Sequence, residues 1–193
     1  MKNCSLCGDL LRHRTQVVLP IVDENPLLFF MGEAPGASED KAGIPFVGAA
    51  GKYHQRFIEA LGNPPKVVCN VINCRPTILS ETGRVINGKP TEQQIQNCSR
   101  WVDELIVTHM PSCKLMILYG LYPIQRFLPW TAPFKVSDYA GNFYTITHAG
   151  VTFEVFACYH PATLVYNYKY FAPKWKEIVL KLKEHLNDKI YKS

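Results

Sequence analysis

Short apolar runs recur along the chain, each bounded by glycine, proline or polar residues. Nearly unbroken runs of this length are typical of strands that are buried on both faces of a sheet. Three such strands are predicted at residues 27–31, 67–72 and 114–119. Residues 142–147 and 151–158 are predicted to form a further pair of strands around a turn at residues 148–150.

One helix has clear signals at both of its ends. Thr91 and Gln94 have the spacing of a capping box, which predicts a helix start, and Pro111 marks the end of the same helix. Its apolar positions recur at helical spacing, which predicts one buried face. The residues on that face are Ile95, Cys98, Val102, Leu105, Ile106 and His109.

The other helices are predicted from composition and spacing alone. Residues 47–61 have the composition of a helix, and a short helix is expected after Gly120. A last helix is expected from about Pro173. Its core-facing residues are predicted to be Trp175, Ile178, Val179, Leu182 and Leu186. The stretch 75–90 is expected to be a polar loop because it contains two glycines and few apolar residues.

The alternation of buried strands with helices predicts an α/β fold of three layers, α/β/α, with a central, mostly parallel sheet. All 193 residues are expected to form a single domain. In such sheets, ligands bind at the carboxyl ends of the parallel strands. This rule selects residues 32–51, 70–76 and 160–164 together with Gly120, and these segments are also the chemically unusual ones.

The composition sets broad limits on function. The chain has a formal net charge of +5 and 19% charged residues, as in an ordinary globular protein. This mildly basic balance permits contacts with the phosphates of a nucleic acid but does not require them. No apolar stretch reaches the length needed to span a membrane, and the N-terminus lacks a signal core, so an intracellular protein is expected.

The segment GEAPGASEDKAGIPFVGAAG, residues 32–51, combines five glycines with three carboxylates directly after a predicted strand. It is neither a GxGxxG turn nor a phosphate loop with Lys and Ser/Thr, and its acids would repel a phosphate. Small residues would instead let a flat ligand approach the backbone, and Phe46 could stack on a nucleobase. A structural turn with solvent-facing acids and a core phenylalanine fits the glycines equally well.

Two polar residues stand at the ends of predicted strands. The amide of Asn70 can match the edge of a pyrimidine, which presents N–H beside C=O. His160, held before Pro161, can donate a hydrogen bond to an oxygen that gains negative charge. A lone Asn or His is more often structural, so it is their shared position at one sheet edge that favours a site.

The chain contains seven cysteines, and a reducing compartment argues against a disulfide framework. Cys4 and Cys7 form a CxxC pair, Cys74 follows the second strand and Cys98 lies on a predicted buried helix face. Four thiolates can hold a cubane iron–sulfur cluster or a tetrahedral zinc ion. The other three cysteines lie inside or next to predicted strands: Cys69, Cys113 and Cys158.

In chain order the motifs are CxxC, RTQVV at residues 14–18, the glycine-rich segment, NVINCRP, a helix that bears Cys98, and YHPATL at residues 159–164. This arrangement resembles the family 4 uracil-DNA glycosylases, the iron–sulfur members of the uracil-DNA glycosylase superfamily. The resemblance runs from Cys4 to about Leu164. The segment 32–51 is its most specific part.

The resemblance implies roles for individual residues. It implies a structural [4Fe-4S] cluster, bound in part by an N-terminal segment of residues 1–20, whose ligands would be Cys4, Cys7, Cys74 and Cys98. The residues implied in catalysis are Glu33, Glu39 and His160. The residues implied in uracil binding are Gly32, Ala34, Pro35, Gly36, Phe46 and Asn70. The residues implied in DNA binding are Pro161, Ala162, Leu164, Tyr166 and Lys169.

The activity implied by the resemblance is hydrolysis of the N-glycosidic bond of deoxyuridine in DNA, which releases uracil and leaves an abasic site. The base must leave the DNA stack before an enzyme can reach this bond. Uracil-containing DNA is therefore the expected partner, with a monomer as the expected state and no membrane partner. The alternatives are a non-catalytic uracil- or DNA-binding relative that keeps the cluster, and a redox or metal-binding module of flavodoxin-like outline.

The sequence departs from the family in a loop that probes DNA. Tyr166 stands where the family often has an arginine after the HPA motif, and Lys169 is a candidate to replace that arginine. Insertion of Leu164 or of a tyrosine into the minor groove is expected. The departure bears on DNA-strand preference more than on the chemistry.

Overall fold

The structure is a computed structural model that describes residues 1–189. Within these residues the main sheet has six strands in the order β1-β3-β2-β6-β8-β7. The four inner strands are parallel to one another, and the two edge strands, β1 and β7, are antiparallel to their neighbours. The strands are β1 (Ile21–Val22), β2 (Leu28–Gly32), β3 (Lys66–Asn70), β6 (Leu115–Tyr119), β7 (Phe143–His148) and β8 (Val151–Cys158). The predicted, mostly parallel sheet is confirmed.

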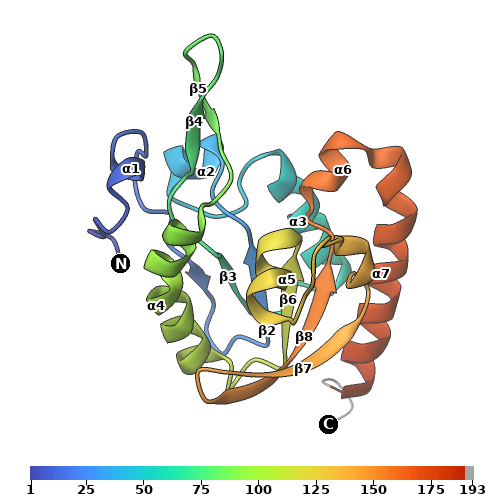
Figure 1. Ribbon diagram of the computed structural model, residues 1–193. Coiled ribbons are helices and arrows are strands. Elements are labelled where there is room, and N and C mark those ends of the chain that lie inside the picture. The colour runs from blue at the N-terminus through green and yellow to red at the C-terminus, as the bar shows by residue number, and fades with distance from the viewer. Residues whose placement is uncertain (190–193) are drawn as a thin grey trace.

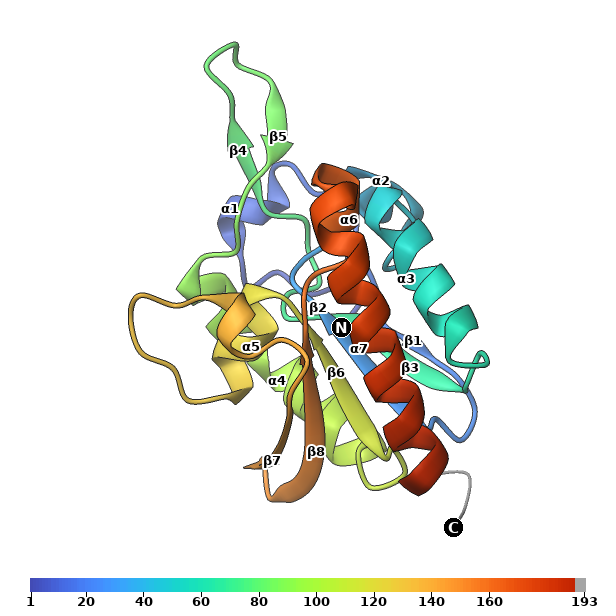
Figure 2. The ribbon, with the colours of Figure 1, turned by 90° about the vertical axis from the view of Figure 1, so that its right-hand side faces the viewer.

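Helices cover both faces of this sheet (Figure 2). Alternate residues of β2 point to opposite faces, so Phe29 and Met31 enter one core while Leu28 and Phe30 enter the other. The first core is covered by α4 (Glu92–His109) and α5 (Leu121–Phe127), and the second by α3 (Ala49–Ala60) and α7 (Tyr168–Lys189). The predicted three-layer α/β/α arrangement is therefore confirmed.

The start of α4 shows why its position could be predicted. The Thr91 hydroxyl accepts a hydrogen bond from the Gln94 N–H at 3.2 Å, and the Gln94 side chain accepts one from the Thr91 N–H at 3.0 Å. These two bonds complete the predicted capping box. Cys98, Val102 and Ile106 are buried on the predicted face, and the helix ends at His109.

The expected polar loop at residues 75–90 is wrong, because this stretch contains a β-hairpin. Strands β4 (Thr77–Leu79) and β5 (Val85–Asn87) pair in antiparallel register and form a small second sheet. Figure 1 shows the hairpin projecting from the body, and its last residue, Asn87, lies near Gly36 at the start of α2 (Ala37–Ala42). Two short runs of β-branched and aliphatic residues flank a turn that contains Gly83, which has a φ of 73°.

The last helix begins five residues earlier than expected, at Tyr168 rather than Pro173. The side chain of Asn167 accepts a hydrogen bond from the N–H of Tyr170 at 3.3 Å, as an N-cap residue does. Pro173 consequently lies inside the helix. The short helices α1 (Gly8–Leu11), α2 and α6 (Ala162–Tyr166) were not anticipated, and neither was the 3-10 turn Val136–Asp138.

The carboxyl ends of β2, β3 and β8 meet at one edge of the sheet, where α2, α6 and the hairpin also lie (Figure 1). This edge unites the segments that the sequence singled out. Among the helices of residues 1–189, none combines the length and the apolar character that crossing a bilayer requires.

Candidate active site

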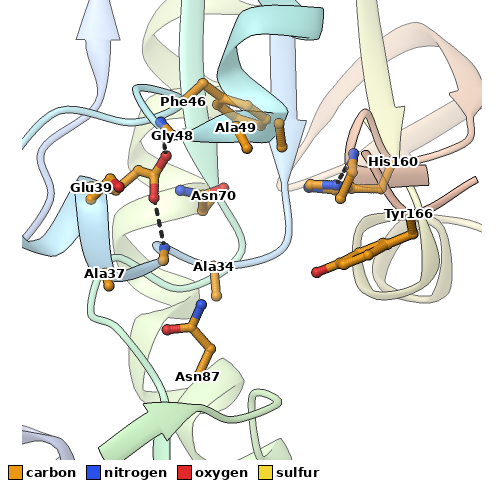
Figure 3. Close-up of a pocket in the computed structure, with 14 residues that line it drawn as sticks. Ala34, Ala37, Glu39, Phe46, Gly48, Ala49, Asn70, Asn87, His160 and Tyr166 are labelled. Carbon is orange, nitrogen blue, oxygen red and sulfur yellow. Dashed lines mark hydrogen bonds between the residues drawn. The ribbon is translucent and has the colours of Figure 1, made fainter. Parts of the chain in front are cut away.

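A pocket of about 300 Å³ opens at the carboxyl edge of the parallel strands. It brings together the glycine-rich segment, the end of β3, the end of the hairpin and the segment after β8 (Figure 3). The lining residues are Ala34, Gly36, Ala37, Ser38, Glu39, Phe46, Gly48, Ala49, Ala50, Asn70, Asn87, His160, Ala162 and Tyr166. The volume is sufficient for a single nucleobase and lies at the lower end of the range for ligand pockets.

Glu39 holds the two halves of the glycine-rich segment together. Its carboxylate accepts hydrogen bonds from the N–H of Gly36 at 3.1 Å and from the N–H of Gly48 at 2.6 Å. A Cβ at position 36 would lie only 2.8 Å from the Glu39 carboxylate, so glycine is needed for this close approach. Glu39 therefore has a structural role at the pocket wall as well as a position from which it can act on a ligand.

Phe46 supplies an aromatic surface to the pocket. Its backbone has a φ of 56°, in the left-handed region, which directs the ring over Gly32. A Cβ at position 32 would come within 2.5 Å of both the Phe46 ring and the Asn70 side-chain oxygen, so Gly32 leaves room for both groups. The unusual backbone conformation thus places a stacking face beside a polar amide.

The Phe46 ring rests on a buried histidine that the sequence analysis did not identify. The rings of Phe46 and His54 have centroids 4.4 Å apart, and His54 Nδ1 lies 3.1 Å from the Tyr119 hydroxyl. Burial, together with Lys66 and His160, lowers the pKa of His54 to about 3, so this imidazole is neutral. Helical spacing from Gly51 through His54 to Phe57 was the signal that could have placed it on the buried face.

Asn70 ends β3 opposite Gly32 in the parallel register and is 4% exposed. Within residues 1–189, no hydrogen bond of its side-chain amide is formed. Because Asn70 lines the pocket, the donor and the acceptor of this amide are available for a ligand. Figure 3 places the amide between Glu39 and Phe46.

His160 lies on the opposite wall from Glu39 (Figure 3). Its Nδ1 accepts a hydrogen bond from the N–H of Ala162 at 3.1 Å, so the single proton of the neutral ring lies on Nε2. Burial lowers the pKa of His160 to about 4, which keeps the ring neutral near pH 7. The side chain can therefore donate one hydrogen bond to a ligand without carrying charge.

Several other predicted site residues lie outside the pocket lining. Glu33 does not line the pocket; burial raises its pKa, and the Lys89 ammonium opposes that rise. Gly32 and Pro35 are buried behind the lining. Among the predicted DNA-binding residues, Pro161 is buried, and Leu164 is 8% exposed and packs in the second hydrophobic core.

Tyr166 is the most exposed large side chain beside the pocket. It is 86% exposed, lines the pocket and extends from the end of α6 on the same side as His160 (Figure 3). Ala162 also lines the pocket, and Lys169 is exposed at the start of α7. The aromatic ring that replaces the expected arginine is thus presented to solvent at the pocket mouth.

Asn87 is a lining residue that the sequence analysis missed. It ends β5, and its side-chain oxygen accepts a hydrogen bond from Arg75 Nε at 2.7 Å. That bond fixes the amide so that its Nδ2 faces the pocket beside Gly36. Because residues 75–90 were expected to be a loop, the strand that carries Asn87 to the pocket was not foreseen.

The four cysteines expected to act together are brought to one place, away from the pocket. Cys4 and Cys7 pack with Cys74 around Leu10, and Cys98 projects from the buried face of α4. Burial raises the pKa of Cys98 to about 11, and the other three cysteines add to that rise, so the four sulfurs are within electrostatic range.

Three of these sulfurs accept hydrogen bonds from neighbouring N–H groups. Arg14 donates to Cys74 Sγ at 3.0 Å, the Asn73 backbone to Cys98 Sγ at 3.4 Å, and the Asn97 side chain to Cys7 Sγ at 3.5 Å. Donors of this kind stabilise thiolates. Within residues 1–189, no group of three or more His, Cys, Asp or Glu side chains is close enough to hold a single metal ion.

The remaining three cysteines are buried in the core of the fold. Cys69 and Cys158 are buried within β3 and β8, and Cys113 is buried just before β6. Burial raises the pKa of all three thiols. They are small apolar side chains in this fold.

The fold is an α/β sandwich, and its pocket brings together an aromatic ring, a side-chain amide and a neutral histidine. The chain belongs to the uracil DNA glycosylase superfamily, whose family model matches residues 19–183. It is 34% identical to the Type-4 uracil-DNA glycosylase of Sulfurisphaera tokodaii over 170 residues, covering 86% of this chain and 72% of the relative. It is 32% identical to that of Pyrobaculum aerophilum (86% and 81% covered) and 29% identical to that of Archaeoglobus fulgidus (85% and 79%). The resemblance inferred from the motifs is confirmed.

Acid should weaken the fold through the two neutral histidines, His54 and His160. The pKa of each lies below the ordinary value of 6.5, so the unfolded chain binds protons more readily. Their contribution to the free energy of unfolding is complete above about pH 6.5 and is lost as the pH falls toward 4. The slope is at most about 1.4 kcal/mol per pH unit for each proton. Denaturant unfolding between pH 7 and 4.5 measures it.

His54→Gln provides the comparison for this measurement. Glutamine can still hydrogen-bond the Tyr119 hydroxyl but does not titrate, so the variant should lose less stability than the wild-type protein over the same pH range. Parallel losses in the two proteins would contradict the assignment of a neutral, buried His54.

Proposed function

We propose that the protein is a DNA repair hydrolase that cleaves the N-glycosidic bond of deoxyuridine in DNA. Water adds hydroxyl to the sugar C1′, uracil leaves with a proton on N1, and an abasic site remains. The observation that carries this proposal is the juxtaposition of Phe46, an unpartnered Asn70 amide and a neutral His160 in one nucleobase-sized pocket. The relatives of the same family are named uracil-DNA glycosylases.

Uracil fits the polar groups of this pocket. The Asn70 side-chain oxygen would accept the uracil N3–H, and its N–H₂ would donate to the adjacent carbonyl. Cytosine presents an amino group and an unprotonated ring nitrogen along the same edge, so it would leave both groups of Asn70 mismatched. Leaving a buried amide mispaired costs more free energy than a matched hydrogen bond contributes. This difference would make the pocket select uracil over cytosine.

His160 is suited to stabilise the leaving group. As the glycosidic bond breaks, negative charge accumulates on the uracil ring and its oxygens. The Nε2–H of a neutral imidazole, held in place by the Ala162 N–H at Nδ1, can donate to such an oxygen. Because the ring has already been fixed by that contact, little reorganisation is needed during the reaction.

Glu39 is suited to act on the sugar side of the glycosidic bond. Positive charge develops on the deoxyribose, and a carboxylate at the pocket wall favours that charge or orients the attacking water. The two backbone N–H groups at Gly36 and Gly48 fix the position of its oxygens. Glu33 lies outside the lining, so in this account it does not act directly on the substrate.

DNA is the partner that this chemistry requires. The uridine must turn out of the stack to enter the pocket, and exposed Tyr166 stands at the mouth, where an unstacked neighbouring base would lie. Lys169, which is exposed at the start of the next helix, would contact a phosphate. The protein is proposed to act as a single-domain monomer.

The four gathered cysteines are proposed to bind a [4Fe-4S] cluster: Cys4, Cys7, Cys74 and Cys98. A cubane takes one thiolate at each of four iron atoms, so its ligands stand farther apart than those of one metal ion. The other three cysteines raise the pKa of Cys98, so the four sulfurs are near one another. Within residues 1–189 they are nevertheless too far apart to hold one metal ion, and this spacing fits a cubane. The cluster would link the N-terminal segment to the Cys74 loop and to α4, and glycosidic hydrolysis needs no electron from it.

Asn70→Ala is expected to abolish most uracil excision. A labelled oligonucleotide with one uracil, cleaved by alkali at abasic sites, reports the rate. Loss of the paired donor and acceptor should lower that rate by about 10²-fold or more, with unchanged iron–sulfur absorbance. Asn187→Ala, at an exposed position of α7, is the matched control and should retain the wild-type rate. Wild-type activity in Asn70→Ala would contradict the pocket assignment.

Cys74→Ala is expected to yield a colourless, less stable protein. The wild-type protein, purified without oxygen, should contain about four iron atoms per chain and absorb visible light. Cys113→Ala removes another buried thiol and should retain both properties. Equal iron content in the two variants, or zinc in place of iron in the wild-type protein, would refute the proposed cluster.

A further inference from the structure

The hairpin β4–β5 projects from the same edge of the sheet as the pocket and carries four exposed aliphatic side chains. Figure 1 shows it at the carboxyl end of the strands, and Figure 2 shows that it extends well beyond the body. The aliphatic residues are Ile78 (55% exposed), Leu79 (65%), Val85 (41%) and Ile86 (42%). Exposed apolar side chains clustered on one projecting element indicate a contact surface.

The register of the hairpin divides these side chains between two faces. Thr77 pairs with Asn87, Ile78 with Ile86, and Leu79 with Val85. Paired residues in an antiparallel ladder share a face, and successive pairs alternate between faces. The Leu79–Val85 pair therefore lies on the same face as Asn87, and the Ile78–Ile86 pair lies on the other.

Asn87 identifies which face is turned toward the pocket. It lines the pocket, with its amide fixed by Arg75 Nε at 2.7 Å. Val85 is two residues from Asn87 on the same strand, so its side chain stands about 7 Å farther out along the hairpin. Asn87 lies across the pocket from Tyr166 (Figure 3), so the apolar pair Leu79–Val85 extends the pocket wall outward on the Asn87 side.

We infer that the Leu79–Val85 pair packs against the nucleotides that flank an extrahelical uridine. This inference rests on the proposed function. Proteins that unstack DNA commonly place aliphatic side chains against the exposed faces of bases and sugars in the minor groove. With Tyr166 on the other side of the mouth, the strand that carries the uridine would be held between two apolar contacts.

The charge around the hairpin fits a DNA strand. Residues 75–90 contain Arg75, Arg84 and Lys89 against a single carboxylate, Glu81. Arg84 is exposed at the tip of the hairpin and Lys89 at its base. The two cations therefore stand on opposite sides of the apolar pair, where each can contact a DNA phosphate. An aliphatic surface bordered by cations matches bases and sugars bordered by phosphates.

The turn at the tip gives the hairpin a defined shape. The Arg84 N–H donates to the Ser80 hydroxyl at 3.0 Å, and the Gly83 N–H donates to the Ser80 carbonyl at 2.9 Å. Together with the bond between Arg75 and Asn87 at the base, these contacts fix both ends of the two-stranded unit. The side-chain pair is thereby presented in a fixed direction, as a recognition surface requires.

The test compares the two faces of the same hairpin. The variant L79S/V85S removes the pocket-side pair, and I78S/I86S removes the opposite pair by the same chemistry. Both are titrated with a duplex that contains a 2′-fluorinated deoxyuridine, which resists cleavage, beside a fluorescent 2-aminopurine. Thermal unfolding confirms that both variants are folded.

L79S/V85S is expected to bind this duplex about tenfold more weakly than the wild-type protein and to lose the fluorescence increase of the unstacked neighbour. I78S/I86S should bind within about twofold of wild type. Equal affinities for the two variants would overturn the inference, whether both match wild type or both are weakened alike. Uracil excision by the wild-type protein reports separately on the proposed function. If the wild-type protein neither excises uracil nor binds this duplex, both the proposed function and the inference about the hairpin are overturned.

Discussion

The pocket depends on one carboxylate that binds two backbone amides. Glu39 accepts hydrogen bonds from Gly36 and Gly48, and these contacts draw the two ends of the loop around α2 toward each other. Phe46 lies between those ends, where the left-handed backbone turns its ring over Gly32. An acid among glycines is therefore no obstacle to ligand binding. The glycines let the carboxylate reach the backbone, and the carboxylate then gives the glycine-rich segment a single shape.

The side chains aimed into the pocket are mostly neutral. His160 donates from Nε2 without a positive charge, Asn70 offers an unpaired amide, and the Phe46 ring rests on a neutral His54. A neutral pyrimidine can enter such a site without meeting strong charge. In the proposed reaction, charge arises only as the glycosidic bond breaks, and the fixed donors and the Glu39 carboxylate would then act on a state that differs from the bound substrate. Preference for that state is what accelerates a reaction.

Local signals in the sequence were sufficient for most of the fold. The buried strands, the capping box at Thr91 and the pairing of β7 with β8 all follow from patterns within a few residues of each other. The motifs placed Glu39, Phe46, Asn70 and His160, which the structure brings into one pocket.

Features that depend on distant partners could not be foreseen. Asn87 reaches the pocket only because residues 77–87 pair as a hairpin, and His54 matters because Tyr119 and Phe46 fold against it. Leu164 was expected to meet DNA, but its exposure depends on how α6 packs against α3 and α7, and no local pattern reveals that packing.

The most direct test of this account is the single-turnover rate of uracil excision by Glu39→Gln, measured beside affinity for the uncleaved DNA. The amide keeps the size of the side chain, removes its charge and leaves one of the two backbone N–H groups without an acceptor. We expect a rate at least about 10²-fold below wild type, with DNA affinity changed only a few-fold. The exposed Glu24→Gln serves as the control and should behave as wild type. Excision by a folded Glu39→Gln protein at the wild-type rate would contradict the account.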